Sequence, residues 1–397
     1  MGKEFDIIVF GATGFTGSLI SEYLLKHYGN DCRIALAGRS EDKLKALAQG
    51  FEGDVPLIIG DAADLDAMRS IAGRCRLVVA CTGPFILYGS NMVQACAELG
   101  TDYVDVTGEV YWSGLMLNQH EQAAKDSGAR IISFCGFDSV PSDLGVYLLQ
   151  KKAVEKYGQP FERVKMRVLD LRGAGALGGS IATMKATMAR AASEQDIPAF
   201  MADPYGLCPD RLDIEQPNGR KPRFDEELNS WAAPFLMQDI NTKIVHRTNW
   251  QLGYPYGTSF RYDEMCSTGP GEEGKANIER SIKTSSGFEI EEGAADAAPG
   301  EGPARELQDA GYYSIAFYGI ENEQVKAEVN VADDCDPGCA STSKLVGESA
   351  MCLLQDDVTV VGGFWTPVAA MAEPLYARLQ AEQTLQFTER FNDASVA

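Results

Sequence analysis

The stretch VFGATGFTG, from Val9 to Gly17, constrains this chain more than any other feature of its sequence. It follows the apolar run FDIIVF and precedes a segment whose apolar residues recur at helical spacing. The glycines at positions 11, 14 and 17 permit a tight turn, a close approach of the backbone to a pyrophosphate, and close packing of a helix on a strand. Strand, loop and helix in this order predict a nucleotide-binding loop, although a plain structural turn would also use glycine.

Apolar runs alternate with helix-like stretches up to about residue 140, a pattern typical of a parallel sheet covered by helices. Six such strands joined by short crossovers predict an α/β fold with a doubly wound, Rossmann-type sheet. We expect the strands in FDIIVFG, RIALAG, VPLIIGD, RLVVACTG, DYVDVTG and RIISFCG.

The segments after Phe161 are longer and alternate more strictly, which favours a sheet with antiparallel neighbours. We expect strands in RVKMRVLDLRG, TKIVHRTNWQLG and YYSIAFYGIENEQVKAEVNV. Helices are expected in GSIATMKATMARAAS, ASTSKLVGESAMCLLQ and TPVAAMAEPLYARLQ. Residues 285–308 are rich in Gly, Ala, Pro and acidic residues and predict an exposed or partly disordered loop.

The composition excludes several classes of partner. The chain has 57 acidic and 35 basic residues, and the resulting formal net charge of -22 repels nucleic-acid phosphates and anionic lipid surfaces alike. No apolar run reaches the roughly 20 residues of a membrane span, and the N-terminus lacks the layout of a signal peptide. We therefore expect a cytoplasmic protein that binds a small molecule and no nucleic acid.

The ten cysteines are scattered, mostly within apolar segments, as reduced core thiols would be. Cys335 and Cys339 are close in sequence, but their spacing is not that of the common redox motif. None of the three histidines lies near this pair, so we expect no metal site.

The end of the second expected strand, RIALAGRS, discriminates between cofactors. An NAD site usually places Asp or Glu there to bind the ribose hydroxyls, whereas this chain has Gly38, Arg39 and Ser40. Arg39 can pair with a 2′-phosphate through its planar guanidinium, and Ser40 can donate a hydrogen bond. The sequence thus favours NADP (NADPH) over NAD, the alternative for Arg39 being a solvated surface side chain.

The candidate catalytic residues follow strands that end at the edge where α/β enzymes bind their ligands. They are Tyr88, after the fourth strand, and Asp138 and Ser139, after the sixth. Tyr88 can donate a proton, but a ring packed in a loop explains it equally well. Capping of the helix that begins near Pro141 is the alternative for the other two. Glu109 is either a substrate or cofactor contact or a carboxylate bound by backbone amides.

Several motifs taken together resemble the saccharopine dehydrogenase-like oxidoreductases, which include the mycobacterial trans-acting enoyl reductases and animal lipid-droplet-associated homologues. The motifs are GATGFTG, AGRSEDKL, TGPFILYGSNMVQACAELGTDYVDVTGE and CGFDSVPSDLG. The resemblance is dense over residues 5–150 and returns over 234–249, 336–354 and 362–371. One departure is Cys339, where similar proteins tend to have an aromatic residue, so the role of that loop stays open.

The resemblance implies a Rossmann domain over residues 1–145, an inserted mixed α/β substrate or dimerisation domain over 146–335, and C-terminal helices over 336–397 that return to the first domain. It also implies which residues bind NAD(P). The pyrophosphate would be cradled by Gly11, Thr13, Gly14, Phe15, Thr16 and Gly17. The adenosine ribose or its phosphate would be held by Arg39 and Ser40. The nicotinamide would be flanked by Thr82, Gly83, Pro84 and Phe85.

Three functional hypotheses remain open at this point. The first is an NADP-dependent oxidoreductase that reduces a C=C bond of an enoyl, acyl or polyketide-like substrate. The second is a saccharopine-type amino-acid (C–N) dehydrogenase, which needs cations that bind the substrate carboxylates; Arg167, Arg172, Lys185 and Arg190 are adequately explained as surface charges. The third is a non-catalytic nucleotide-binding or lipid-surface protein, which an exposed apolar patch around WTPVAAMAEPLY would support. A homodimer and peripheral lipid contact are compatible with the sequence.

Overall fold

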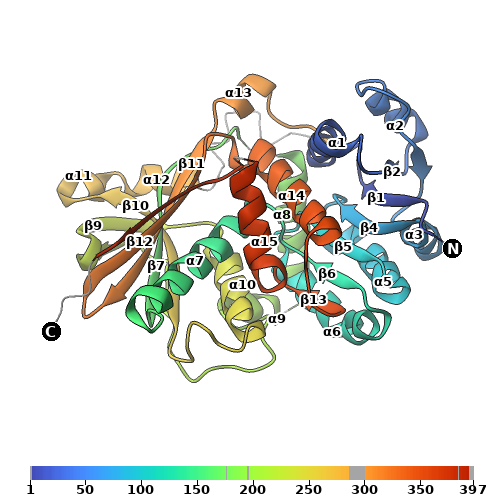
Figure 1. Ribbon diagram of the computed structural model, residues 1–397. Coiled ribbons are helices and arrows are strands. Elements are labelled where there is room, and N and C mark those ends of the chain that lie inside the picture. Colours follow the sequence, from blue (N-terminus) through green and yellow to red (C-terminus); the bar gives the residue numbers. More distant parts are fainter. Residues whose placement is uncertain (1, 176, 195, 286–299, 383, 393–397) are drawn as a thin grey trace.

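The computed structural model describes residues 2–175, 177–194, 196–285, 300–382 and 384–392. The chain forms two seven-stranded sheets that lie side by side, each packed against helices (Figure 1). The predicted loop over residues 285–308 falls largely outside the described residues; of its length, α13 (Arg305–Asp309) is helical. Among the described helices, none combines the length and apolar composition that crossing a bilayer would need.

The first sheet is parallel, and all six of its predicted strands are confirmed. They are β1 (Phe5–Phe10), β2 (Ile34–Gly38), β3 (Leu57–Ile59), β4 (Cys75–Ala80), β5 (Asp102–Asp105) and β6 (Arg130–Ile132). A seventh strand, β13 (Gly363–Trp365), extends the sheet beside β6, so that the order is β13-β6-β5-β4-β1-β2-β3. Ile7, Ile8 and Val9 on β1 are fully buried, as expected of a strand covered on both faces.

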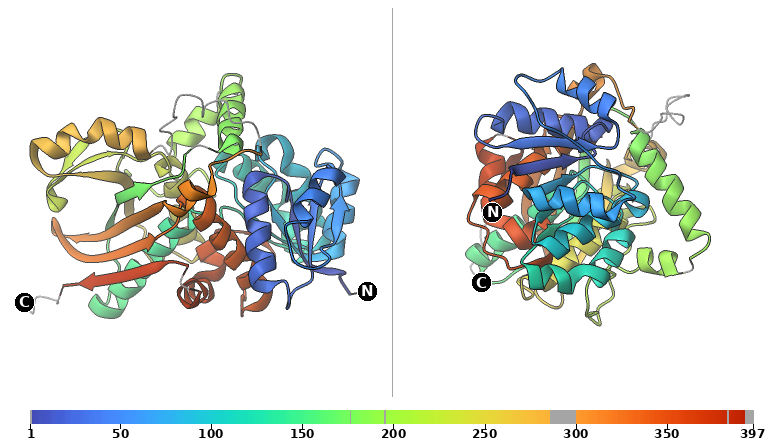
Figure 2. Two further views of the ribbon diagram at one scale, coloured as in Figure 1. Left: turned by 90° about the horizontal axis from the view of Figure 1, so that it is seen from above. Right: turned by 90° about the vertical axis from the view of Figure 1, so that its right-hand side faces the viewer.

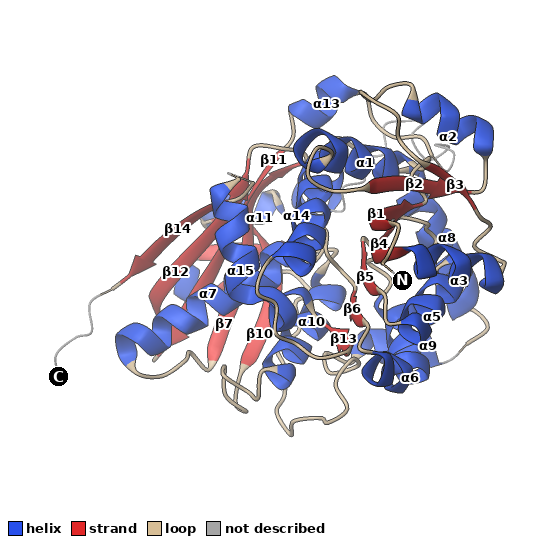
Figure 3. Cartoon of the chain, turned by 45° about the vertical axis from the view of Figure 1, so that its right-hand side comes forward, coloured by secondary structure: helices blue, strands red, loops and turns tan. Residues whose placement is uncertain are grey.

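Helices cover both faces of this sheet, which makes it doubly wound (Figure 3). Ile7 and Val9 of β1 belong to one core with α1 (Phe15–Tyr28), α14 (Thr342–Gln355) and α15 (Pro367–Ala381). Ile8 and Phe10 belong to a second core with α3 (Leu65–Arg74), α5 (Ser90–Leu99) and α6 (Val110–Ser127). The short helices α2 (Glu41–Ala48) and α4 (Phe85–Tyr88) follow β2 and β4.

The second sheet is mixed, as its alternating segments predict. β7 (Arg163–Arg172) pairs in parallel with β10 (Arg261–Gly269) and antiparallel with β11 (Tyr312–Glu321). The order is β14-β12-β11-β7-β10-β9-β8, and the remaining strands are β8 (Arg223–Asp225), β9 (Ser230–Pro234), β12 (Gln324–Asp333) and β14 (Gln386–Phe391). α7 (Val140–Tyr157) packs on β11 and β12, while α11 (Gly271–Ala276) and α12 (Ile278–Ser285) pack on β9 and β10.

Two further helices lie between the sheets when the molecule is seen from above (Figure 2). α8 (Gly178–Ala191), which was expected, packs against α4 of the first region. α9 (Asp196–Ala202) packs against α6 and α8. The middle of the chain therefore contacts the carboxyl edge of the first sheet, where α4 follows β4.

One predicted strand is wrong. All of TKIVHRTNWQLG except its last two residues lies in the helix α10 (Gln238–Gln251), where every residue from Asn241 to Asn249 is buried. Because this helix is enclosed on nearly all sides, its apolar residues do not form the one-sided stripe that identifies a helix. The β-branched residues within it then favoured the strand interpretation.

The C-terminal helices are tied to the first helix by a buried carboxylate. Glu348 on α14 is 0% exposed and accepts hydrogen bonds from the hydroxyls of Tyr23 and Tyr28 on α1, each 2.6 Å away. Arg378 on α15 lies 3.3 Å from its other oxygen. Gly347 leaves room for the ring of Tyr23, since a Cβ there would lie 2.5 Å from Cδ1 of that ring. One residue thus holds α1, α14 and α15 together.

We expect Glu348→Ala to destabilise the protein by about 3 kcal/mol, because two tyrosine hydroxyls and a guanidinium lose their shared partner in a buried site. Chemical denaturation followed by circular dichroism measures this. Tyr28→Phe removes a single donor and should cost only about 1 kcal/mol. Equal effects of the two variants would contradict the central role of Glu348.

Candidate functional site

The glycine-rich loop connects β1 to α1 in the way that its sequence predicts. Gly11 has a φ of 85°, a left-handed conformation that glycine adopts without strain. A Cβ at Gly17 would collide with the carbonyl oxygen of Gly11, so this glycine lets the helix pack directly on the loop. The N-cap residue Gly14 supplies no side-chain hydrogen bond, and the first amide groups of α1 therefore remain available to an anion.

A buried hydroxyl group without a partner lies beside this loop. Thr82 follows β4, and its Oγ1 has no hydrogen-bond partner among the described residues. A Cβ at Gly11 would lie 2.5 Å from this oxygen, so the two residues face each other across adjacent strand ends. Buried polar groups are almost always paired in folded proteins. The orphaned hydroxyl beside uncapped amides fits a site that a dinucleotide completes.

The predicted phosphate-binding residues lie at the end of β2. Arg39 is exposed, and within the described ranges no ion pair or hydrogen bond engages its guanidinium. Ser40 caps α2 by accepting a hydrogen bond from the amide of Lys43, 3.4 Å away, which leaves its hydroxyl proton free to donate. Thr13 of the glycine-rich loop lies against Gly38, as a Cβ there would be 3.7 Å from its Oγ1. The end of β2 therefore adjoins the glycine-rich loop.

The remaining predicted cofactor residues have differing surroundings. Thr16 is half-buried in the first turn of α1. Phe15 is covered by Gly302, where a Cβ would collide with the phenyl ring. Gly83 lies near Thr183 of α8, and Pro84 is the N-cap of α4. The ring of Phe85 packs on Trp112 in the core, so only its backbone lies at the edge of the sheet.

Glu109 occupies the N-terminus of α4. Its Oε1 accepts a hydrogen bond from the amide of Phe85 at 2.7 Å, and its Oε2 accepts one from the amide of Ile86 at 2.9 Å. The hydroxyl of Thr183 on α8 donates to Oε1 at 3.3 Å. Burial raises the pKa of the Glu109 carboxyl, and the two amides oppose that shift. This geometry favours the backbone-bound alternative over a direct contact with substrate, and Thr183 is a partner that the sequence did not indicate.

Asp138 is the candidate catalytic residue with the most suitable surroundings. Its Oδ2 would lie 2.8 Å from a Cβ at Gly108, and that glycine also adjoins Ile240 of α10. In the part of the chain that the structure describes, no hydrogen bond or ion pair engages its carboxyl group. Burial raises the pKa of this carboxyl to about 6. Asp138 can therefore hold and release a proton close to neutral pH.

Ser139 and Tyr88 are placed differently. Ser139 is the N-cap residue of α7, but its hydroxyl makes no capping bond and instead donates to Oδ1 of Asn241 at 3.2 Å. The alternative that the Ser139 side chain caps the helix is therefore wrong, because α10 supplies a partner for this hydroxyl. Tyr88, the last residue of α4, has a side chain that is 42% exposed.

Asp105 positions the loop that carries Asp138, and the sequence analysis missed it. This buried carboxylate at the end of β5 accepts hydrogen bonds from the amides of Thr107 and Phe134 and from the hydroxyl of Ser133. Burial raises its pKa to about 6, and these hydrogen bonds oppose the shift. The sequence signal was DVT, an aspartate two residues before a residue whose amide it can bind in a local turn.

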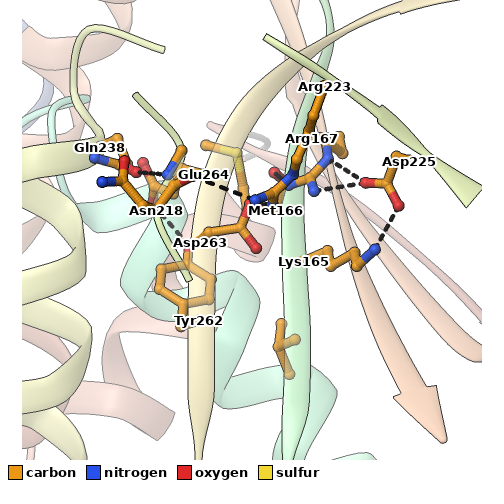
Figure 4. A network of polar contacts seen from close by, with 12 residues as sticks. Lys165, Met166, Arg167, Asn218, Arg223, Asp225, Gln238, Tyr262, Asp263 and Glu264 are labelled. Atoms are coloured by element: carbon orange, nitrogen blue, oxygen red, sulfur yellow. Dashed lines mark hydrogen bonds and ion pairs between the residues drawn. The ribbon is translucent and has the colours of Figure 1, made fainter. Parts of the chain in front are cut away.

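A second polar cluster, which includes Lys165, Arg167, Asp225 and Asp263, lies on the second sheet (Figure 4). Arg167 is 1% exposed, not a surface charge as expected, and it pairs with Asp225 at 2.6 Å and Asp263 at 3.0 Å. Lys165 pairs with Asp225 as well. Neighbouring residues on β7 point to opposite faces, so Arg167 lies opposite Met166, which belongs to the core shared with the first sheet. These cations are neutralised locally and face away from the predicted cofactor site.

A cavity of about 260 Å³ opens on the same far face, lined by Arg167, Glu227, Ser230, Tyr318 and Arg390 among others. It includes no residue predicted to bind cofactor or substrate. Cys335 accepts a hydrogen bond from Lys344 at 3.0 Å, and Cys339 is buried. Within the described residues, no three His, Cys, Asp or Glu side chains come together as metal ligands would.

Comparisons with known proteins agree with these motifs. Residues 7–132 match the family model of the saccharopine dehydrogenase NADP binding domain. A trans-acting enoyl reductase of Mycobacterium tuberculosis is 33% identical, with 98% of this chain and 99% of the relative covered. One from Mycobacterium ulcerans is also 33% identical over 95% of this chain and 96% of the relative. A further relative from M. tuberculosis, to which the trans-acting enoyl reductase activity is assigned provisionally, is 36% identical over 96% of each chain.

Among solved structures, the saccharopine dehydrogenase (L-Glu forming) of Saccharomyces cerevisiae shares the fold. It superposes with a TM-score of 0.55 and covers 98% of this chain and 99% of its own, at 13% sequence identity. Because the sequence identity is low, this similarity shows a common fold and nothing about function.

We expect Thr82→Val to leave the stability of the free protein unchanged or slightly raised, since the hydroxyl it removes has no internal partner. Its affinity for NADP⁺ should fall about three- to tenfold through the loss of one hydrogen bond. Thermal denaturation and isothermal titration calorimetry measure the two quantities. A destabilised variant with full affinity would show that the hydroxyl serves the fold and not the nucleotide.

Proposed function

This chain is an NAD(P)-dependent oxidoreductase that belongs to the saccharopine dehydrogenase-like family containing the trans-acting enoyl reductases, and on this premise we propose that it reduces the C=C bond of an enoyl or polyketide-like acyl substrate with NADPH. One observation carries the reaction type. An anion-binding loop and an unpartnered carboxyl group with a pKa of about 6 lie at the same edge of the first sheet. The two meet the needs of hydride transfer followed by protonation.

The free guanidinium of Arg39 supports NADPH as the preferred cofactor. It is exposed at the end of β2, next to the loop that receives the pyrophosphate, where a 2′-phosphate would require a cation. Ser40 can donate its hydroxyl proton to the same phosphate. The backbone amides of α1, the hydroxyl of Thr82 and the carboxyl edge of β4 would hold the rest of the dinucleotide.

We expect Arg39→Ala to weaken NADPH binding by about 10- to 100-fold and NADH binding by less than twofold, since only NADPH carries the charge that Arg39 would pair with. Fluorescence titration with both nucleotides measures this difference. Lys45→Ala, which removes an exposed cation paired with Glu41, is the matched control. Equal losses for both nucleotides would refute the 2′-phosphate assignment.

The proposed reaction needs a hydride donor and a proton donor. Bound NADPH would supply the hydride to the β-carbon of the substrate, and negative charge then develops on the carbonyl oxygen. Asp138 would hold a proton on its carboxyl group and transfer it to the resulting enolate. The pKa raised by burial favours the protonated form of Asp138 below about pH 6. Glu109 and Asp105 would act on the backbone, by holding the start of α4 and the loop before α7.

We expect Asp138→Asn to lower kcat by roughly 10²- to 10⁴-fold with little change in NADPH affinity, because the amide has no proton to transfer. In the wild type, kcat should fall as pH rises above about 6, and the variant should lose this dependence. Asp357→Asn on the surface is the control. Tyr88→Phe tests the other donor, and a loss confined to that variant would assign the proton to Tyr88.

The two alternatives have less support. A C–N dehydrogenase would need cations near the nicotinamide. Arg167 instead forms ion pairs with Asp225 and Asp263 on the far face of the second sheet, and Arg190 pairs with Glu194. The patch named for lipid contact is largely buried, including Val368 and Leu375 on α15.

The decisive experiment follows NADPH absorbance with a panel of enoyl thioesters, imines and amino acids. Turnover of the enoyl thioesters supports the proposal. Turnover confined to imines or amino acids would favour the C–N dehydrogenase, and the absence of binding by either nucleotide would leave only a non-catalytic role.

A further inference from the structure

The position of Asp138 is fixed through the residues on either side of it. Its own carboxyl group accepts no hydrogen bond from any residue that the structure describes. The backbone amide of Phe137, the residue before it, donates to Thr342 Oγ1 at 3.1 Å. The hydroxyl of Ser139, the residue after it, donates to Asn241 Oδ1 at 3.2 Å. Two anchors from distant parts of the chain, Thr342 and Asn241, therefore flank the candidate acid.

The first anchor is itself held by the loop whose role the sequence left open. Thr342 is the first residue of α14, and its hydroxyl donates to the carbonyl oxygen of Pro337 at 2.8 Å. Asp336 closes the same loop by accepting a hydrogen bond from the amide of Cys339 at 2.6 Å. The loop thus ends in a residue that contacts the segment carrying Asp138.

Gly136 lets α14 approach this segment closely. A Cβ at Gly136 would lie 3.2 Å from Cγ2 and 3.4 Å from Oγ1 of Thr342. A side chain there would press on Thr342 and disturb its hydrogen bond with the amide of Phe137.

The second anchor is tied to the second sheet. Asn241 Nδ2 donates to Oε2 of Glu264 on β10 at 2.9 Å, and the hydroxyl of Tyr262 donates to Oε1 of the same carboxyl group at 2.7 Å. All three side chains are buried. Because Glu264 accepts on both oxygens, the NH₂ group of Asn241 faces it and the carbonyl oxygen of Asn241 faces Ser139.

We propose that Thr342 and Asn241 are positioning residues, which act through Phe137 and Ser139 to orient the carboxyl group of Asp138 towards the substrate. This inference rests on the proposed reduction, in which Asp138 transfers the proton. An acid without hydrogen-bond partners keeps its proton available, but its backbone must be held, since a misplacement of about 1 Å can lower a rate about 100-fold. Anchors on the two adjacent residues meet both needs.

The test of the first anchor is Thr342→Val, which keeps the shape of the side chain and removes its hydroxyl. With NADPH and the 2-butenoyl thioester of N-acetylcysteamine, we expect kcat to fall about 10- to 100-fold, with KM and NADPH affinity changed by less than about twofold. Thr342→Ser keeps the hydroxyl and should retain kcat.

The matched control for the first anchor is Thr101→Val. The buried hydroxyl of Thr101 likewise donates to a carbonyl oxygen, that of Ala72 at 2.8 Å, and accepts a hydrogen bond, from Lys3 at 3.2 Å. Thr101 precedes β5 and so lies at the opposite edge of the first sheet from Asp138. This variant should lose stability as Thr342→Val does, but keep its kcat.

The second anchor is tested by comparing Ser139→Ala with Ser142→Ala. Both serines are buried at the start of α7 and bonded to Asn241, since Ser142 Oγ accepts from Nδ2 at 3.1 Å. Only Ser139 adjoins Asp138. We expect Ser139→Ala to lower kcat about tenfold and Ser142→Ala to leave it unchanged.

An Asp138→Asn background separates positioning from other effects. Substitutions that act only through Asp138 should cause no further loss once the acid is gone. Thr342→Val and Ser139→Ala should therefore change kcat by less than about twofold in that background. A further tenfold loss there, or an unchanged kcat for both single variants, would overturn the proposal.

Amide hydrogen exchange over residues 134–144 tests the anchors without the reaction. We expect residues 137–140 to exchange about tenfold faster in Thr342→Val and Ser139→Ala, and as in the wild type in Thr342→Ser. If this holds while Asp138→Asn retains full turnover, the anchors stand and the acid role of Asp138 fails. Exchange that is unchanged in both variants would refute the anchors, whatever the turnover.

Discussion

The contact between Gly17 and the carbonyl oxygen of Gly11 is the constraint on which the rest of the structure depends. It seats α1 directly on the end of β1, and this brings the uncapped helix terminus next to Thr82, which follows β4. The same placement fixes the outer side of α1, where Glu348 attaches the C-terminal helices. A side chain at position 17 would lift the helix, and both the uncapped N-terminus of α1 and the docking of the C-terminal helices would move with it.

The first sheet could be predicted from sequence because parallel strands buried on both faces are continuous apolar runs bounded by glycine and polar residues. The second region follows local rules less closely. In α10 the buried side chains include Asn241, His246 and Thr248, so neither the apolar period of a helix nor the polar face of a strand is present. On β7 the alternation was read correctly, but Arg167 is enclosed by partners from β8 and β10 that no local pattern reveals.

The candidate site also has a part that local sequence patterns predict and a part that they do not. The cofactor side is local in sequence: glycine spacing and Arg39 after a strand indicate it directly. The catalytic side depends on contacts between distant segments. Asp138 could be nominated from its position after a strand, but its raised pKa comes from burial beside Gly108 and Ile240. Ser139 looked equivalent in sequence and is bound to Asn241 instead.

Glu109 has a consequence for how α4 and α8 can move. Its Oε1 accepts hydrogen bonds both from the amide of Phe85 on α4 and from the hydroxyl of Thr183 on α8, so one buried carboxylate bridges the two helices. A displacement of either helix changes the geometry of the hydrogen bond that this acceptor makes to the other. The two helices are therefore coupled mechanically, and a shift of α4 is expected to carry α8 with it.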